Sequence, residues 1–283
     1  MEIKKALITA AGKNQRTLPL QTLVDRDGVQ KAALLVIIEE ILKSGIDEIG
    51  IVIQPRDQDS FRAAAGAHAG RLTFVEQKEP LGYANAVFTG RAFTGGNSFL
   101  LLVGDHLYLS RAEKGCAEQL LEVARAENCA VSAVQPTHES KLPYYGAVGG
   151  LRIQGRNRLY EVETILEKPT PTVAEEKLMV PGLRAGQYLC FFGMHVFTPT
   201  LMDILQELHQ RTGDRSGMGL AQALQQMATQ ERYLALEMEG NRFDIGVKYG
   251  LLNAQLALAL NGSDRDEVLT RLVELLALQV RLQ

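Results

Sequence analysis

The segment "SFLLLVGD", residues 98–105, constrains the fold of this chain more than any other. It holds an unbroken apolar run and then ends in Gly104 and Asp105. A strand with apolar side chains on both sides must be covered on both faces, which is typical of parallel sheets. Further strands are predicted at residues 6–11, 46–53, 71–77 and 129–136. Helical patterns separate them, so the sequence predicts an α/β domain with a mixed, mostly parallel sheet flanked by helices.

The pattern changes after about residue 140. Residues 144–169, "YYGAVGGLRIQGRNRLYEVETILEKP", alternate and are rich in turn residues, which predicts antiparallel hairpins in a small side lobe. From Ser263 onward a capping-type start precedes apolar positions at 269, 272, 276 and 280, which predicts a helix. This helix packs either on the domain or on a partner subunit. We therefore expect one domain over residues 1–260 and a C-terminal helix at 261–283 that is a candidate contact of a homo-oligomer.

Composition excludes several classes of protein. The chain of 283 residues is 46% hydrophobic and 22% charged, with a net charge of −3, so no basic nucleic-acid-binding surface is expected. No apolar stretch is long enough to span a bilayer, and the first residues are charged rather than signal-like. Cys116, Cys129 and Cys190 form neither a zinc nor a disulfide pattern. We expect a cytoplasmic protein without nucleic-acid or membrane partners.

Four segments carry side chains suited to chemistry, and we expect each at the end of a parallel strand. Ligands of open α/β sheets bind outside those strand ends. The first segment is the loop after residues 6–11, where backbone N–H groups and Arg16 could hold phosphate oxygens. An ordinary strand–loop connection is the alternative. With Gly12 as its only glycine, the loop matches neither a Walker loop nor a dinucleotide fingerprint.

The second and third segments offer a base site and a metal ligand. In "VEQKEPLGYANAV", residues 75–87, Gln77 can pair with a base edge and Gly82 lets a planar base lie against bare backbone. The alternative is a Pro-Gly turn before a helix. Asp105 ends a buried strand, where a carboxylate is costly unless it is paired or bound to a metal such as Mg²⁺. A capping Asp in a turn is the alternative.

The fourth segment, "GNRFDIGVKYG" at residues 240–250, holds Asp244 and Lys248. The carboxylate could share a cation with Asp105 while the ammonium reaches a phosphate, or the two could be a helix-start Asp and an exposed Lys. Glu167 and Lys168 precede a proline and could bind hydroxyls and phosphate, or be surface charges.

The five histidines are scattered and complete no nucleophile–base set. His106 is interpreted as a hydrogen-bonded neighbour of Asp105 rather than a substrate contact. His195, inside an apolar segment, is interpreted as a core residue.

Taken in order, these segments resemble the sugar-1-phosphate nucleotidyltransferases, most of all the bacterial UTP–glucose-1-phosphate uridylyltransferase type. The resemblance covers roughly residues 4–258. Its motifs are "ALITAAGKNQRTLP", "EQKEPLGYANAV", "LLLVGDHLY", "YYGAV", "VETILEKP" and "EMEGNRFDIGVKYGLLNA". Each motif alone is weak, but the ordered set is specific.

The resemblance implies a three-layer, Rossmann-like fold and Mg²⁺-dependent transfer of a uridylyl group from UTP to a hexose 1-phosphate, with glucose 1-phosphate as the expected acceptor. Another nucleoside triphosphate such as dTTP is the alternative donor. By resemblance, Asp105 and Asp244 would bind the metal ion, and Gly146 and Glu167 would bind the sugar. Arg16, Lys168 and Lys248 would contact phosphates. The resemblance assigns nucleotide binding to Ala10, Ala11, Gly12, Lys13, Gln77, Pro80 and Gly82.

The opening loop departs from the family pattern. Asn14 and Gln15, which we also assign to nucleotide binding, replace the second glycine and the threonine of the family loop. Arg26, assigned to the nucleotide as well, stands where the family has a lysine. A side chain at position 14 restricts the approach of phosphate. An Arg in place of the family's Lys changes how a reacting phosphate is bound, because the two side chains are not interchangeable. A non-catalytic homologue that binds a nucleotide or sugar nucleotide is therefore the alternative from another class.

Overall fold

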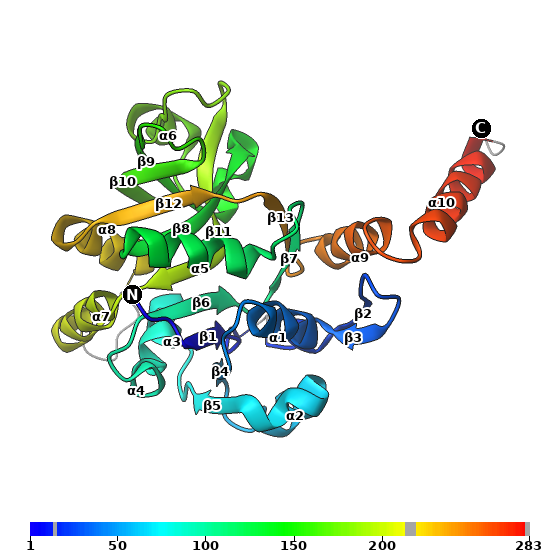
Figure 1. Ribbon diagram of the computed structural model, residues 1–283, viewed down its shortest axis with the longest axis horizontal. Helices are drawn as coiled ribbons and strands as arrows, with labels where there is room; N and C mark the ends of the chain where they lie inside the picture. The colour runs from blue at the N-terminus through cyan, green and yellow to red at the C-terminus, as the bar shows by residue number, and fades with distance from the viewer. Residues whose placement is uncertain (14–15, 213–218, 281–283) are drawn as a thin grey trace.

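The computed structural model describes residues 1–13, 16–212 and 219–280 (Figure 1). Two residues of the predicted phosphate loop, Asn14 and Gln15, lie outside this part of the chain. The strands are β1 (Lys5–Thr9), β2 (Thr22–Val24), β3 (Gln30–Ala32), β4 (Glu48–Ile53), β5 (Leu72–Glu76), β6 (Phe99–Val103), β7 (His106–Ser110), β8 (Ala130–His138), β9 (Gly146–Arg152), β10 (Leu159–Glu167), β11 (Gln187–Phe197), β12 (Tyr233–Glu237) and β13 (Gly240–Asp244).

The helices follow the predicted alternation with the strands. They are α1 (Ala33–Lys43), α2 (Gln58–Ala65), α3 (Tyr83–Thr89), α4 (Arg91–Thr94), α5 (Cys116–Glu127), α6 (Pro171–Lys177), α7 (Pro199–Thr212), α8 (Leu220–Gln230), α9 (Gly250–Leu260) and α10 (Arg265–Val280). Three 3₁₀ turns are η1 (Leu18–Leu20), η2 (Gly66–Arg71) and η3 (Glu139–Tyr144).

The main sheet has the strand order β5-β4-β1-β6-β11-β8-β12-β10-β9. Strands β5, β4, β1 and β6 are parallel, and Ile8 of β1 lies between Ile51 of β4 and Leu102 of β6. Strand β11 pairs antiparallel with both β6 and β8, while β12 runs parallel to β8. The predicted mixed sheet is thus confirmed, with its parallel half at the N-terminal end of the chain.

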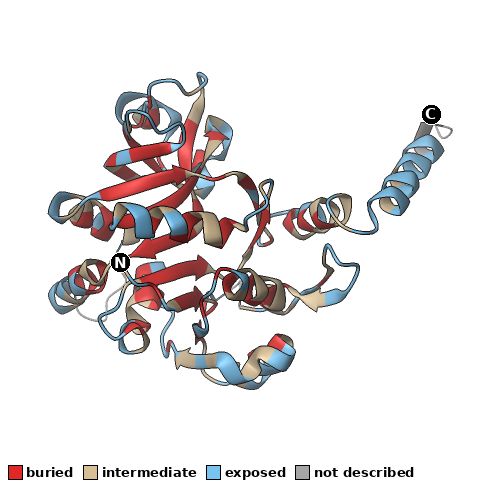
Figure 2. Ribbon diagram, in the orientation of Figure 1, coloured by how far each residue is buried: buried red, intermediate tan, exposed pale blue. Residues whose placement is uncertain are grey.

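Helices cover both faces of the sheet, which explains why its central strands are apolar on both sides. Ile8 contributes to the core cluster beneath α1 and α5, whereas its neighbour Leu7 contributes to the cluster beneath α3, α7 and α8. Successive side chains of a strand point to opposite faces, so one strand supplies both cores. Figure 2 shows the buried strands between helices whose outer sides are exposed. This is the predicted three-layer arrangement.

The second half of the sheet is antiparallel except for the β8–β12 pair, and it carries the side lobe. Strands β9 and β10 pair antiparallel, as predicted, and they extend the main sheet through β12. A small separate core forms where η3 and α6 pack on this edge. It consists of Leu142, Ala147, Ala174, Leu178, Tyr188 and Cys190.

The strand before Asp244 corrects one sequence prediction. Asp244 does not follow a parallel strand, because β13 pairs antiparallel with β7 in a separate two-stranded sheet. The same pair holds Asp244 opposite His106. In a second small ladder, β2–β3, residues 30–32 form a strand directly before α1, which begins at Ala33.

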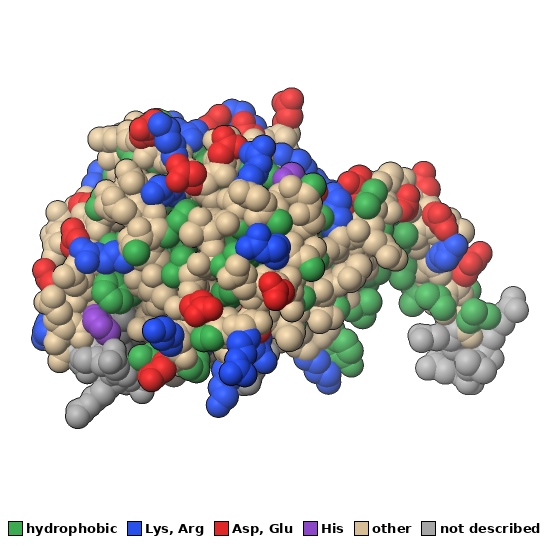
Figure 3. Space-filling model, turned by 90° about the horizontal axis from the view of Figure 1, so that it is seen from below, with side chains coloured by type: hydrophobic (Ala, Val, Ile, Leu, Met, Phe, Trp, Pro, Cys, Tyr) green, Lys and Arg blue, Asp and Glu red, His purple; other side chains and the backbone are tan. Residues whose placement is uncertain are grey.

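The C-terminal segment forms an arm. Helix α9 packs on β13 and β2, whereas α10 continues away from the body of the molecule (Figure 1). Exposed apolar side chains on α10 include Leu269, Val273 and Leu276. Figure 3 shows hydrophobic side chains on this projecting arm. Within the described residues, no helix combines the length and the apolar character needed to cross a bilayer.

Candidate active site

The predicted nucleotide residues meet at one cavity of about 360 Å³. It lies at the carboxyl ends of β1, β5 and β6, because their parallel alignment brings the loops that follow them to one edge of the sheet. The predicted residues that line it are residues 10–13, Gln77, Pro80, Gly82, Asp105 and Asp244. Segments separated by more than 200 residues therefore share one concave space.

One wall is the predicted base segment. The Gln77 side chain is buried, and its Nε2 donates to Asn85 Oδ1 at 2.7 Å and to the Gly82 carbonyl at 3.5 Å. Gly82 has φ +105°, a conformation that side-chain-bearing residues rarely adopt, and a Cβ there would meet open space. The glycine is thus required by the backbone of this turn, and Asn85 holds the amide of Gln77 in place.

The opening loop forms the adjoining wall. Backbone hydrogen bonds hold its start, from Ala10 N–H to the Val52 carbonyl at 2.8 Å and from Gly104 N–H to the Thr9 carbonyl at 2.9 Å. Arg16 does not line the cavity. Its guanidinium bonds Asp57 at 3.0 Å, and Gln54 ties this pair to the loop by donating to the Ala11 carbonyl. The ion pair fixes Arg16 beside the loop.

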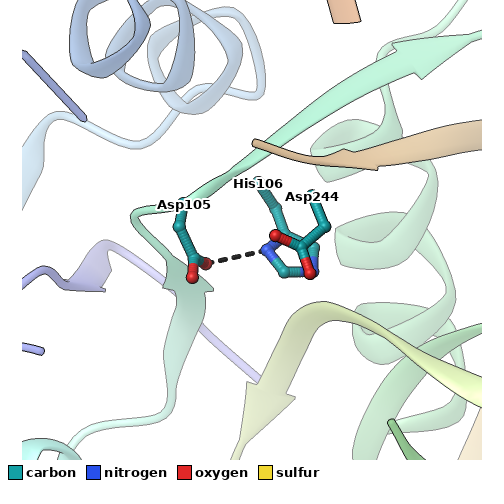
Figure 4. A group of neighbouring side chains, drawn as sticks. All are labelled: Asp105, His106 and Asp244. Atoms are coloured by element: carbon teal, nitrogen blue, oxygen red, sulfur yellow. Dashed lines mark hydrogen bonds and ion pairs between the residues drawn. The ribbon is translucent and has the colours of Figure 1, made fainter. Parts of the chain in front are cut away.

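Two carboxylates and an imidazole lie together in the cavity (Figure 4). One ligand atom each from Asp105, His106 and Asp244 lies within 4.8 Å of the others. His106 Nδ1 is 2.8 Å from Asp105 Oδ1, and the side chains of both residues are more than four-fifths buried. Two carboxylates this close repel each other unless a cation or a donor lies between them. The donor set therefore fits a divalent cation.

Three tyrosines that the sequence analysis did not single out also line the cavity. Tyr83 and Tyr144 are exposed toward it, and Tyr145 lies beside them. Burial of its hydroxyl, with the nearby Asp105 carboxylate, raises the pKa of Tyr83 above its ordinary value, so the phenol stays protonated. The motifs "GYANA" and "YYGAV" contain these tyrosines next to a glycine. That position in the sequence does not by itself show that a side chain lines a cavity.

Tyr145 is fixed by a buried cation. The Arg242 guanidinium lies 3.7 Å from the centroid of the Tyr145 ring. Its two terminal nitrogens have no hydrogen-bond partner among the described residues, and burial lowers the pKa of Arg242. The stacking on Tyr145 is therefore its main stabilising contact.

The predicted sugar residues lie next to Tyr145. Gly146 pairs with Glu167 across β9 and β10, and the Lys168 N–H donates to the Tyr145 carbonyl at 3.2 Å. A Cβ at Gly146 would lie 2.9 Å from Phe191 Cδ2 and 3.0 Å from Glu167 Oε2, so a side chain at this position would crowd both residues. The side chains of Glu167 and Lys168 are more than half exposed and 3.8 Å apart. They border the cavity at its tyrosine side without lining it.

Besides Arg16 and Lys168, the predicted cations Lys248 and Arg26 also lie outside the cavity lining. Lys248 is exposed and sits over the Tyr249 ring, 5.1 Å from its centroid. Arg26 belongs to the β2–β3 turn, where its carbonyl accepts from the Ser263 N–H at 2.8 Å. Its side chain lines a different, much smaller hollow with Glu40 and Tyr108. The structure thus separates Arg26 from the predicted nucleotide site, because the hairpin turns toward the C-terminal arm.

The cysteines and His195 take no part in this site. All three thiols are free and buried, and burial raises the pKa of Cys129 to about 11 and those of the other two above their ordinary values. The site therefore offers no thiolate from these residues. His195 is buried, as predicted, and its Nδ1 bonds Ser132 Oγ at 2.6 Å.

This geometry defines an α/β protein with a candidate ligand site at the carboxyl ends of parallel strands, and comparisons with known proteins identify its family. The Nucleotidyl transferase family model matches residues 5–260. A UTP–glucose-1-phosphate uridylyltransferase of Streptococcus pneumoniae serotype 4 is 27% identical over 97% of this chain and 96% of that protein.

Solved structures share the fold. A UDP-glucose pyrophosphorylase complexed with UDP-glucose superimposes with a TM-score of 0.73 at 23% identity, over 90% of this chain and 98% of that one. A UTP-bound enzyme of the same kind from Acinetobacter baumannii gives a TM-score of 0.72 at 20% identity, over 96% and 99% of the two chains. The chain belongs to the nucleotidyl transferase family. Its predicted fold class is confirmed.

Proposed function

We propose that this protein transfers a uridylyl group from UTP to a hexose 1-phosphate, with glucose 1-phosphate as the acceptor and Mg²⁺ as the cation. The observation that carries the proposal is the single cavity that joins a base-binding wall, a strand-end loop and two carboxylates. The names of the relatives support the choice of UTP and of a glucose derivative.

In the proposed reaction a phosphate oxygen of the sugar 1-phosphate attacks the α-phosphorus of UTP. A new P–O bond forms, the bond from the α-phosphorus to the bridging oxygen breaks, and pyrophosphate leaves with the electron pair. Transfers of this kind need mainly positioning and neutralisation of charge. The protein needs no covalent intermediate for this step, which agrees with the buried, protonated thiols.

Each wall has a role in this arrangement. Gln77, held by Asn85, would read the edge of uracil while the base lies against Gly82. The N–H groups of the opening loop and Lys13 would bind the triphosphate. Asp105 and Asp244 would hold the Mg²⁺, which supplies charge neutralisation at the phosphates when bound.

The acceptor would enter from the tyrosine side. Glu167 and the Gly146 backbone would bind sugar hydroxyls, and Lys168 the phosphate. Tyr145 lines the cavity, and its carbonyl accepts a hydrogen bond from the Lys168 N–H. Lys248 is proposed to move its flexible side chain toward the phosphates when substrate binds.

A panel of nucleoside triphosphates tests the proposal. Purified protein is incubated with Mg²⁺, glucose 1-phosphate and each of UTP, dTTP, ATP, CTP and GTP, and pyrophosphate release is measured. We expect turnover to be fastest with UTP. Faster turnover with dTTP would make the protein a thymidylyltransferase. Tight binding of UTP without pyrophosphate release, across a panel of sugar phosphates, would make it a non-catalytic homologue.

We also propose that residues 1–260 form the catalytic domain and that α10 contacts a second copy of the chain. The apolar side chains of Leu269, Val273 and Leu276 recur at the spacing of one helix face and are about half exposed. The helix that carries these side chains projects away from the body of the molecule (Figure 1). Pairing of two such helices would bury these side chains.

A further inference from the structure

We propose that His106 is a third ligand of the cation held by Asp105 and Asp244, and that it makes the site prefer a first-row transition cation such as Mn²⁺ over Mg²⁺. The inference rests on the proposed metal site and deepens it, since the reaction described above gives His106 no task. Three observations carry it: the position of the imidazole, the hydrogen bond at one of its nitrogens, and the chemistry of the donor set.

The backbone places His106 between the two carboxylates. It follows Asp105 directly and pairs with Asp244 in the β7–β13 ladder. Facing residues in such a pair have neighbouring side chains, so Asp244 lies beside His106 although the two are far apart in the sequence. Figure 4 shows the imidazole in the same space as both carboxylates.

The contact with Asp105 gives His106 and this carboxylate the spacing of two ligands of one cation. An ionised carboxylate only accepts, so without a cation the 2.8 Å contact has Nδ1–H as donor and Asp105 Oδ1 as acceptor. Two ligand atoms that bind side by side to one cation lie about 3 Å apart, which matches this distance. A cation that binds both atoms would replace the proton on Nδ1, and the neutral ring would then carry its proton on Nε2.

The surrounding residues restrict the ring. Gly193, with φ +82°, lies so close that a Cβ there would be 3.3 Å from His106 Cδ2 and 2.8 Å from Val103 Cγ2. The Tyr108 hydroxyl donates to the Gly193 carbonyl at 2.7 Å and holds this strand in position. With only about one-eighth of its side chain exposed, His106 is a fixed donor rather than a mobile surface group.

A nitrogen donor changes which cation fits best. Mg²⁺ prefers an all-oxygen octahedron and gives up water reluctantly. Imidazole nitrogen is better suited to transition cations, and affinities of such sites rise along the series from Mn²⁺. Two carboxylates and one imidazole should therefore discriminate against Mg²⁺ more than two carboxylates alone.

Paramagnetic resonance of bound Mn²⁺ tests this directly and requires no turnover. Mn²⁺ is added to metal-free wild-type protein, and echo-envelope modulation from a coordinated ¹⁴N nucleus is recorded. We expect the nitrogen modulation in the wild type, its loss in His106→Gln, and its retention in His138→Gln, which alters an exposed histidine. Wild-type protein that binds Mn²⁺ without nitrogen modulation would overturn the proposal even if no variant folds.

Competition between the cations gives the second readout. The free Mn²⁺ signal is titrated against Mg²⁺, and we expect the ratio of Mn²⁺ to Mg²⁺ affinity to fall at least about 10-fold in His106→Gln. An unchanged ratio would contradict the inference. Nitrogen modulation without uridylyl transfer would overturn only the proposed function, whereas transfer without modulation would overturn only the inference.

Discussion

Asp244 and His106 face each other in the β7–β13 ladder, so Asp244, far along the chain from Asp105, is held beside that strand-end carboxylate. The antiparallel pair brings Asp244 to the cavity from outside the main sheet. This relationship makes the two carboxylates part of one site, and it carries the first prediction.

Removing either carboxylate should abolish most of the activity without unfolding the protein. We expect Asp105→Asn and Asp244→Asn each to lower kcat/KM by roughly 100-fold or more, because the charge that holds the cation is lost. Asp203→Asn, which changes an exposed aspartate paired with Arg91, is the matched control and should retain activity. Pyrophosphate release measures activity, and thermal unfolding checks the fold. An active Asp105→Asn enzyme would remove the metal assignment.

A side chain at Gly82 should strain the base wall. Because Gly82 has φ +105°, we expect Gly82→Ala to cost about 1–3 kcal/mol of stability. The altered turn should also raise KM for UTP. Gly70→Ala is the control, since that glycine has open space around it and an ordinary φ. Denaturant unfolding and steady-state kinetics measure both effects; equal stability of the two variants would contradict this account.

His195 should make stability depend on pH. Burial lowers the pKa of His195 to about 3, so the folded protein keeps this ring neutral where the unfolded chain would protonate it. The stability it contributes is present above the unfolded pKa of about 6.5 and is lost as pH falls toward 3. At pH 5 the loss is about 2 kcal/mol. We expect His195→Gln to lose less stability than the wild type between pH 7 and pH 5, and parallel curves would show that His195 does not titrate as described.

The apolar face of α10 should set the oligomeric state. We expect light scattering after gel filtration to give a multimer for the wild type and a monomer for the triple variant Leu269→Ser, Val273→Ser, Leu276→Ser. Leu151→Ser is the control, because Leu151 is similarly exposed but lies on β9. A monomeric wild type, or a triple variant of unchanged mass, would contradict the proposed contact.

The parallel half of the fold was predictable because its apolar strands are stable only where both faces of the sheet are covered. An apolar run such as Phe99–Val103 must be buried on both faces, and that places Asp105 at a sheet edge with the loops of the neighbouring strands. The position of Gln77 follows from the same reasoning. These inferences depend on local pattern and strand direction alone.

Other parts of the site depend on contacts that no local pattern encodes. The five residues of β13 do not reveal that they pair with β7, so the antiparallel ladder was missed. The stacking of Arg242 on Tyr145 joins residues 97 positions apart. For Arg26 the local pattern led to a wrong position. Its spacing from the opening loop matches the family, but the β2–β3 turn places it in a different hollow, away from the predicted nucleotide site.

The most direct test of the account follows the α-phosphorus of UTP. Protein, Mg²⁺ and glucose 1-phosphate are incubated with UTP labelled with ³²P at the α-phosphate, and the products are separated. The account predicts that the label appears in UDP-glucose, in equal amount to unlabelled pyrophosphate, and that Asp105→Asn and Asp244→Asn both prevent it. Label that remains in UTP, or that is released as UMP without a sugar nucleotide, would contradict the central claim.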